Sequence, residues 1–330
     1  MRRSCDSQFA RIAVVGSGSL GIYFGARLAL SGADVRFLMR ADLAAVRERR
    51  SLIVREGGRV AELRPVAAFG TPEEIGPVDL VLVTLKATAN RELPRLLNPL
   101  LGPATAILTL QNGIGPDEEI AALFGAERVM GGLAFIAVNR SGPGEVTCVQ
   151  QPTIVLGEFG RPVAERTRAL ARQFEAAGVR MRLAESVPEA RWRKLVWNIP
   201  FNGLSVAAGG ITTDRLCADP LLAAEVRGLM SEVQRAAAAF GFRITEEYLR
   251  QQFDVTPPMG PYRPSTLVDH LEGREVEVEP IWGEPLRRAR TAGVATPRLS
   301  MLYALLKVAN ETRRRVLDCP SAETSPESDR

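Results

Sequence analysis

The junction between an apolar run at residues 12–15 and the glycines that follow constrains the fold more than any other stretch. Gly16, Gly18 and Gly21 have the G-x-G-x-x-G spacing, and a helical pattern over residues 23–30 comes next. Strand, glycine-rich turn and helix in this order are the context in which this spacing predicts a dinucleotide-binding site. A glycine-rich turn that binds nothing is the alternative. The predicted cofactor-binding residues are Gly16, Ser17, Gly18, Ser19, Leu20 and Gly21.

Each glycine of the triplet has its own predicted role. Gly16 permits a tight turn, Gly18 lets the backbone approach a pyrophosphate, and Gly21 allows the helix to pack closely on the strand. The helix that begins here offers backbone N–H groups and a partial positive charge to the phosphates.

Length and composition suit a globular protein with two domains. The 330 residues are 46% hydrophobic and 24% charged, which is enough for two substantial cores. No apolar run reaches about 18 residues, so the sequence predicts no membrane span. Although the net charge is +4, basic and acidic residues are mixed, which favours a solvated surface over a nucleic-acid interface. Residues 1–6 lack the apolar segment of a signal peptide, so we expect a frayed leader.

Cysteine and histidine usage argues against several kinds of site. The four cysteines have no paired spacing, and His270 is the one histidine. This pattern disfavours a zinc site and any Cys–His or Ser–His catalytic unit, and it is compatible with a reducing, cytoplasmic location.

Two basic residues follow predicted parallel strands. Arg40 ends a strand over 34–40 and lies 19 residues after Gly21, where NAD-binding proteins place a carboxylate for the ribose 2′-OH. A guanidinium suits a 2′-phosphate instead, which favours NADP(H) as the cofactor. The carboxylate of Asp42 lies close by in the sequence, so NAD stays an alternative. Lys86 ends the strand over 78–86 and could also reach cofactor phosphate. Exposed basic residues without a ligand are the alternative for both.

The remaining pattern predicts an α/β fold, with an N-terminal Rossmann-type doubly wound sheet followed by an all-helical C-terminal domain. Strand patterns stop near residue 185, so we expect domains at 1–185 and 186–317, with a disordered tail at 318–330. Further strands are expected at 104–110, 128–139, 144–150, 153–157 and 179–183, a hairpin at 52–54 and 59–63, and helices at 91–97, 162–177, 187–208, 219–240, 280–292 and 297–314.

Two further polar groups stand out. Asn112 follows the strand over 104–110, where Asn112-Gly113 is either a turn signal or part of a site. Lys194, Asn198 and Asn202 are each four residues apart, so they share one stripe of a helix that is otherwise apolar. A solvated polar face is the alternative for this stripe.

Taken together, five motifs resemble the ketopantoate reductase (2-dehydropantoate 2-reductase) family, and they occur in order across nearly the whole chain. They are Gly16–Gly21, Val83–Lys86, Gln111–Gly115, Lys194 with Asn198 and Asn202, and Ser265 with Asp269, Arg274 and Glu277. The resemblance implies that NADPH and a small 2-keto acid bind in the cleft between a Rossmann domain and a helical domain. The expected reaction is reduction of 2-dehydropantoate to pantoate, in pantothenate and coenzyme A biosynthesis.

Position by position, the resemblance makes Lys194 the catalytic lysine and Glu277 the active-site glutamate. It assigns substrate or lysine positioning to Asn112, Asn198, Asn202 and Ser265, and assigns the 2′-phosphate to Arg40 and Lys86. Because Asn112 follows a strand beside the expected nicotinamide, it is also a predicted cofactor-binding residue. Asp269 and Arg274 are expected to brace their loop. Partners other than the substrate are not implied, apart from a homodimer that the apolar residues 301–306 would permit.

Chemistry supports the lysine assignment. Hydride transfer to a ketone leaves negative charge on its oxygen, which requires a proton donor or fixed positive charge, and a lysine ammonium supplies both. Departures from the family pattern at Pro200, Thr266 and residues 276–283, together with the bulky Trp197, Phe201 and Trp282, could change the shape of the substrate pocket. The alternatives are therefore a reductase of another 2-keto acid and a non-catalytic NADP(H)-sensing protein.

Overall fold

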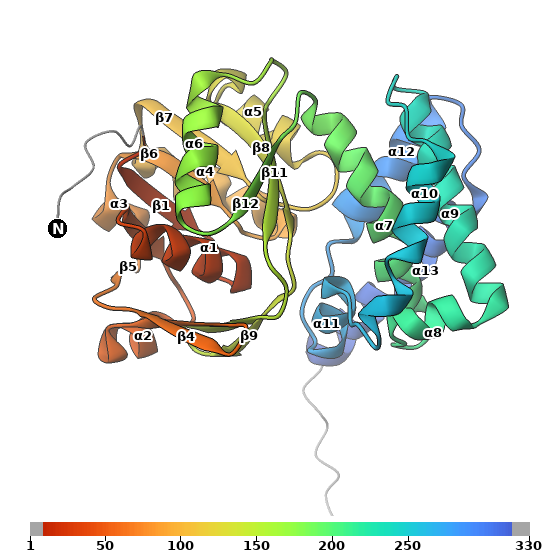
Figure 1. The fold of residues 1–330 in the computed structure, drawn as a ribbon, viewed down its shortest axis with the longest axis horizontal. Coiled ribbons are helices and arrows are strands. Elements are labelled where there is room, and N and C mark those ends of the chain that lie inside the picture. The colour runs from red at the N-terminus through yellow and green to blue at the C-terminus, as the bar shows by residue number, and fades with distance from the viewer. Residues whose placement is uncertain (1–8, 319–330) are drawn as a thin grey trace, which may run out of the picture. The chain divides into compact units, whose positions relative to one another are not determined.

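The computed structural model describes residues 9–318, with side chains described through Glu311. These residues form two compact units, one ending at Lys194 and the other beginning at Leu195 (Figure 1). The predicted domain limits at 185 and 186 stay a prediction. The predicted leader and, apart from Asp318, the predicted tail lie outside the described residues. Within the described part of the chain, no helix has the length and apolar content needed to cross a membrane.

The first unit is built on an eight-stranded sheet with the order β12-β11-β8-β7-β6-β1-β2-β5. The strands from β8 to β5 in this order are parallel, whereas β11 pairs antiparallel to β8 and β12 follows β11. This confirms the predicted doubly wound sheet. The strands are β1 (Arg11–Val15), β2 (Asp34–Leu38), β5 (Ala67–Phe69), β6 (Val78–Val83), β7 (Leu101–Thr109), β8 (Val129–Phe135), β11 (Thr153–Glu158) and β12 (Arg180–Leu183).

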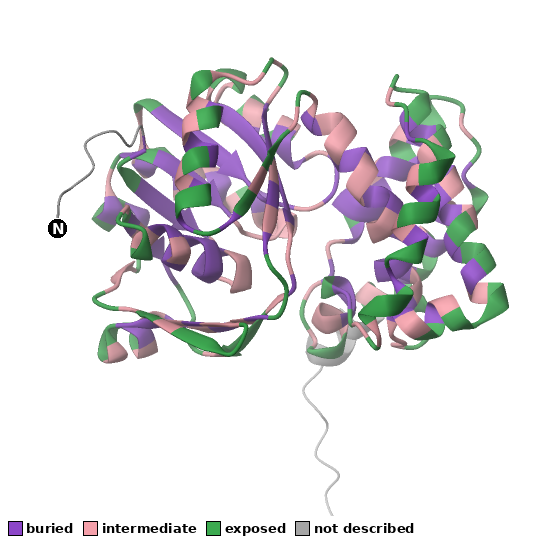
Figure 2. Ribbon diagram, in the orientation of Figure 1, coloured by how far each residue is buried: buried purple, intermediate pink, exposed green. Residues whose placement is uncertain are grey.

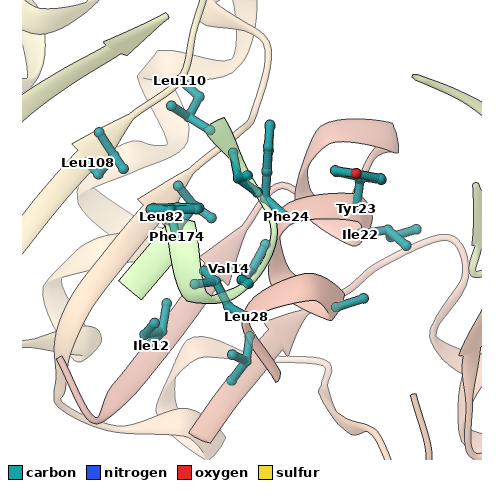
Figure 3. Packing of buried hydrophobic residues seen from close by; sticks show 14 of the residues in the cluster. Ile12, Val14, Ile22, Tyr23, Phe24, Leu28, Leu82, Leu108, Leu110 and Phe174 are labelled. Atoms are coloured by element: carbon teal, nitrogen blue, oxygen red, sulfur yellow. The ribbon is translucent and has the colours of Figure 1, made fainter. Parts of the chain in front are cut away.

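Both faces of this sheet are buried along its central strands, which explains the consecutive apolar residues 12–15 in β1 and 80–83 in β6 (Figure 2). Along β1, Ile12 and Val14 belong to one hydrophobic cluster, whereas Ala13 and Val15 belong to the other. On the first face, Val14 and Leu82 pack in the cluster that contains Phe24 and Phe174 from the covering helices (Figure 3). The helices of this unit are α1 (Ser19–Leu30), α2 (Leu43–Arg49), α3 (Pro72–Ile75), η1 (Ala87–Glu92), α4 (Leu93–Leu97), η2 (Asn98–Leu100), α5 (Pro116–Phe124), η3 (Ala126–Arg128) and α6 (Glu165–Ala176).

A second, four-stranded sheet has the order β4-β3-β10-β9. It contains the predicted hairpin, now β3 (Leu52–Glu56) and β4 (Arg59–Leu63), which pair antiparallel. The single strand predicted over 128–139 is wrong, because the chain leaves the main sheet after Phe135 and enters the small sheet as β9 (Val138–Gly142) before β10 (Glu145–Cys148). Both halves are apolar at their start, so periodicity alone did not mark the switch between sheets.

The second unit is helical in all its described elements, as predicted. The division between the units falls within α7 (Val187–Ala207), which continues through Pro200. Phe201 and Trp282 are fully buried, and the Trp282 indole N–H donates to the carbonyl of Ile199 at 3.0 Å, so both pack the core of this unit. The other helices are α8 (Thr213–Ala218), α9 (Pro220–Ala238), α10 (Glu246–Asp254), η4 (Pro257–Met259), α11 (Ser265–Leu271), the π-helix η5 (Glu279–Gly283), α12 (Glu284–Thr291) and α13 (Pro297–Asp318).

Candidate active site

The carboxyl ends of four neighbouring parallel strands carry the predicted cofactor residues of the first unit. In the order β7-β6-β1-β2, these strands are followed by Asn112, Lys86, Gly16 and Arg40 respectively. Parallel strands end at a common edge, and ligands of doubly wound folds bind outside that edge. The sheet therefore brings these four residues to the edge where the sequence pattern predicts a dinucleotide.

The glycine-rich turn has the backbone that its spacing predicts. Gly16 has φ +106°, and a Cβ there would lie 2.3 Å from the backbone nitrogen of Leu85. A Cβ on Gly21 would lie 2.3 Å from the carbonyl oxygen of Gly16, so the close approach of α1 to β1 requires glycine. A Cβ on Gly18 meets no described atom within 4 Å, which leaves this face of the turn open to a ligand.

The turn is anchored on both sides. The Ser17 hydroxyl donates to the carbonyl of Leu38 at the end of β2 at 2.8 Å, and Thr84 Oγ1 donates to the carbonyl of Gly16 at 2.6 Å. Among the described residues, no side chain caps the start of α1, and its first turn contains no acidic residue. Its N–H groups and positive helix end thus fit a pyrophosphate, which is the group that this fold implies.

Arg40 and Asp42 differ sharply in their surroundings. Arg40 is exposed just beyond β2. Asp42 is buried, and its carboxylate accepts hydrogen bonds from Arg140 at 2.5 and 2.6 Å and from the Gly144 N–H at 2.9 Å. The carboxylate of Asp42, which was the sequence argument for NAD as the cofactor, is therefore already hydrogen-bonded within the protein. Arg40, in contrast, is exposed to solvent.

Lys194 is held by two oxygen acceptors of the first unit. Its Nζ donates to Asn112 Oδ1 and to the carbonyl of Ala134, both at 2.8 Å, and lies 5.2 Å from the centroid of the Phe135 ring. The side chain of Asn112 thus binds the predicted catalytic lysine, while Gly113, with φ +86°, turns the chain after it. The turn interpretation of Asn112-Gly113 is therefore confirmed, whereas the role of Asn112 in a binding site stays a prediction.

Sequence reasoning missed Arg191, a buried residue one helical turn before Lys194. Its guanidinium pairs with the buried carboxylate of Asp117 through Nε and, at 2.6 Å, through Nη2. Nη1 donates to the carbonyls of Gln111 at 2.8 Å and Gly113 at 3.0 Å, on either side of Asn112. Arg191 therefore fixes the segment that positions Lys194. The sequence offers no local signal for this pair, because Arg191 and Asp117 lie 74 positions apart.

A buried amide chain holds the same segment from the other side. Gln111 Nε2 donates to the carbonyl of Leu85 at 3.0 Å and to Asn90 Oδ1 at 2.6 Å, and Asn90 Nδ2 donates to Glu119 Oε2 at 2.6 Å. Because Leu85 precedes Lys86, these bonds couple the ends of β6 and β7. The half-buried Lys86 is thereby carried on a fixed backbone.

In the second unit, Asn202 has a structural contact that the sequence did not specify. This residue is 2% exposed, and its Oδ1 accepts the backbone N–H of Thr266 at 3.1 Å, so it caps α11. Ser265, the first residue of α11, is exposed. The expected brace is confirmed, since Arg274 Nε donates to Asp269 Oδ1 at 2.8 Å.

The alternating carboxylates before α12 differ in their contacts. Glu279 accepts hydrogen bonds from Arg287 and from the Tyr303 hydroxyl, both at 2.7 Å. Burial raises the pKa of Glu279, but these hydrogen bonds outweigh it and hold the pKa below the ordinary value. Glu277 is half-buried, as is Asn198. The catalytic role of Glu277 and the substrate contacts of Asn198, Asn202 and Ser265 stay predictions.

Comparison with known proteins bears on both units. Residues 12–161 match the family model described as Ketopantoate reductase PanE/ApbA, and residues 186–310 match its C-terminal counterpart. A 2-dehydropantoate 2-reductase from Nostoc sp. is 37% identical over 309 residues, covering 92% of this chain and 96% of the relative.

Solved structures agree. The crystal structure of 2-dehydropantoate 2-reductase from Geobacter metallireducens is 44% identical with a TM-score of 0.88, covering 91% of this chain and 99% of the other. The corresponding structure from Methylococcus capsulatus is 34% identical with a TM-score of 0.84, covering 92% and 97%. The likeness extends over both units and confirms the resemblance seen in the five motifs, so this chain belongs to the ketopantoate reductase family.

Proposed function

We propose that this protein catalyses the NADPH-dependent reduction of 2-dehydropantoate to pantoate, a step of pantothenate and coenzyme A biosynthesis. The observation that carries the proposal is the lysine ammonium of Lys194, held by Asn112 and Ala134 in the unit that carries the glycine-rich turn. Membership of the ketopantoate reductase family supports the substrate, and the names of the relatives support it further.

The basic residues beyond β2 and β6 support NADP(H) as the cofactor. These strands flank β1, so Arg40 and Lys86 follow the two neighbours of the strand that leads into the glycine-rich turn. A guanidinium and an ammonium are the donors that proteins use for a 2′-phosphate. The engagement of Asp42 by Arg140 removes the competing acceptor for a ribose 2′-OH.

Lys194 supplies the proton chemistry in this proposal. When bound, the reduced nicotinamide provides the hydride. Lys194 donates a hydrogen bond to the ketone oxygen of the substrate, stabilises the negative charge that develops there and then transfers a proton to it. Asn112 and the carbonyl of Ala134 accept hydrogen bonds from the ammonium and so fix its direction before the substrate binds.

Polar groups of the second unit complete the proposed machinery. Glu277 either orients the ammonium or binds a hydroxyl of the substrate, and a nearby carboxylate favours the charged form of a lysine. Asn198, Asn202 and Ser265 are the proposed neutral partners for the hydroxyl and carboxylate of the substrate.

A substrate panel tests the proposal. NADPH oxidation is followed by absorbance with 2-dehydropantoate and with 2-keto acids that differ in branching and in the terminal hydroxyl. The proposal predicts the highest kcat/KM with 2-dehydropantoate. A higher kcat/KM with another 2-keto acid would identify a different reductase, and tight NADPH binding without turnover of any keto acid would identify a sensing protein.

A further inference from the structure

The Asp42 carboxylate is bound by groups from the small sheet. Arg140, on β9, donates to both carboxylate oxygens at 2.5 and 2.6 Å, and the Gly144 N–H donates to Oδ2 at 2.9 Å. The side chain of Asp42 is 8% exposed, whereas that of Arg140 is 37% exposed. A buried carboxylate needs such donors, because an unpaired charge in this position would be costly.

The turn between β9 and β10 is shaped to make this contact. Gly144 has φ +66°, and a Cβ there would lie 2.6 Å from Val46 Cγ2 of α2, so only glycine fits. Arg49, also on α2, donates through Nη2 to the carbonyl of Pro143 at 2.8 Å. The turn is therefore fixed against α2 and presents its N–H to Asp42 independently of Arg140.

Asp42 lies close in the chain to the predicted binder of the 2′-phosphate. Arg40 comes two residues earlier, and Leu38, two residues before Arg40, accepts the hydroxyl of Ser17 in the glycine-rich turn. In this region of dinucleotide-binding folds, a carboxylate accepts the ribose 2′-OH of NAD, and the same charge repels the 2′-phosphate of NADP. An Asp42 carboxylate without these hydrogen bonds would therefore weaken the binding of a 2′-phosphate by Arg40.

We propose that Arg140 is a specificity-determining residue that secures NADPH preference by keeping the Asp42 carboxylate away from the cofactor. This inference rests on the proposed function and assigns its cofactor selectivity to a pair outside the glycine-rich motif. Without Arg140, the carboxylate retains one backbone donor in a buried place, so it turns toward solvent. There it pairs with Arg40 and repels the 2′-phosphate, while it accepts the 2′-OH of NADH.

The experiment measures dissociation constants of NADPH and NADH by fluorescence titration, which requires no turnover. The variants are Arg140→Met, Asp42→Asn and the double variant, with Arg49→Met as a matched control that loosens the same turn without touching Asp42. We expect Arg140→Met to lower the NADPH preference on the order of tenfold, the effect of one hydrogen bond to a charged group. We expect the double variant and Asp42→Asn to keep the wild-type preference, and Arg49→Met to keep it as well.

Several outcomes would overturn the inference. An unchanged preference in Arg140→Met contradicts it outright. If the NADPH preference is still reduced in the double variant, Arg140 contacts the phosphate itself or only supports the loop. A reduced NADPH preference in Asp42→Asn has the same meaning. If Arg140→Met does not fold, as judged by circular dichroism, a loss of preference in Asp42→Asn decides against the inference and a retained preference supports it. Wild-type protein that fails to bind NADPH refutes the proposed function as well, whereas the other outcomes leave that function standing.

Discussion

Lys194 Nζ donates to Asn112 Oδ1 at 2.8 Å, although the two residues are 82 positions apart in the sequence. The lysine belongs to α7, and the asparagine follows the central strand β7 of the parallel sheet. The ammonium is therefore aimed by the unit that carries the glycine-rich turn. Orientation of this kind lowers a barrier because the catalytic group needs no reorganisation during the reaction.

Replacement of Asn112 tests this orientation. We expect Asn112→Ala to lower kcat by about ten- to a hundredfold, because the ammonium loses one of its fixed acceptors. Steady-state kinetics with saturating NADPH measures the change. Arg193→Met on the same turn of α7 is the control, since Arg193 pairs with Glu189. Equal kcat values for Asn112→Ala and the control would show that Asn112 does not position the lysine.

We expect Arg191 to affect stability and catalysis by separable routes. Arg191→Met leaves Asp117 buried without its ionic partner, so we expect the free energy of unfolding to fall by about 3–5 kcal/mol. Arg191→Met with Asp117→Leu should recover much of this stability, because an apolar pair can replace a buried ion pair. The double variant should still have a reduced kcat, because the carbonyls of Gln111 and Gly113 lack their donor. Denaturant unfolding and kcat are measured on both variants. If the double variant recovers full kcat together with its stability, the role of Arg191 is purely structural.

Arg40 should determine affinity for the phosphate that distinguishes NADPH from NADH. We expect Arg40→Met to weaken NADPH binding by about ten- to a hundredfold, as for loss of a charge-assisted contact, and to leave NADH binding within about twofold. Titration calorimetry with each nucleotide measures both. A parallel weakening of NADH would place Arg40 elsewhere on the cofactor.

Glu158 gives the first unit an acid-sensitive ion cluster. Burial raises the pKa of this carboxyl, but hydrogen bonds from Arg166, Thr167 and Arg161 outweigh it and lower the pKa in the folded state. The unfolded chain therefore binds more protons in acid, so the stabilisation is present above about pH 4.5 and is lost as the pH falls through the lowered pKa. We expect Glu158→Gln to be less stable at pH 7 and to have a flatter pH dependence below pH 4.5, measured by urea unfolding. Parallel stability curves for variant and wild type would contradict this.

The main sheet and most long helices could be predicted from the sequence because their signals are local. Residues 12–15 of β1 are all apolar, since alternate side chains enter two different cores. The spacing of Gly16 and Gly21 likewise indicates that both positions require glycine, because a Cβ at either would clash with backbone atoms. Short helices such as α10 and α11 were missed because their buried residues are few.

The contacts that surround the predicted site could not be predicted, because they join distant segments. Arg191 meets Asp117 across 74 positions, and Arg140 meets Asp42 across 98. In the sequence, nothing local to these residues shows which partner each of them meets. Only the fold brings the partners of each pair together.

The most direct test of the account is a single-turnover measurement on Lys194→Ala with bound NADPH and 2-dehydropantoate, together with the NADPH dissociation constant. The account predicts a rate of hydride transfer lower by about three orders of magnitude, as for loss of a general acid and of charge stabilisation, with NADPH affinity within about threefold of wild type. A hydride-transfer rate near that of the wild type would contradict the central role of Lys194.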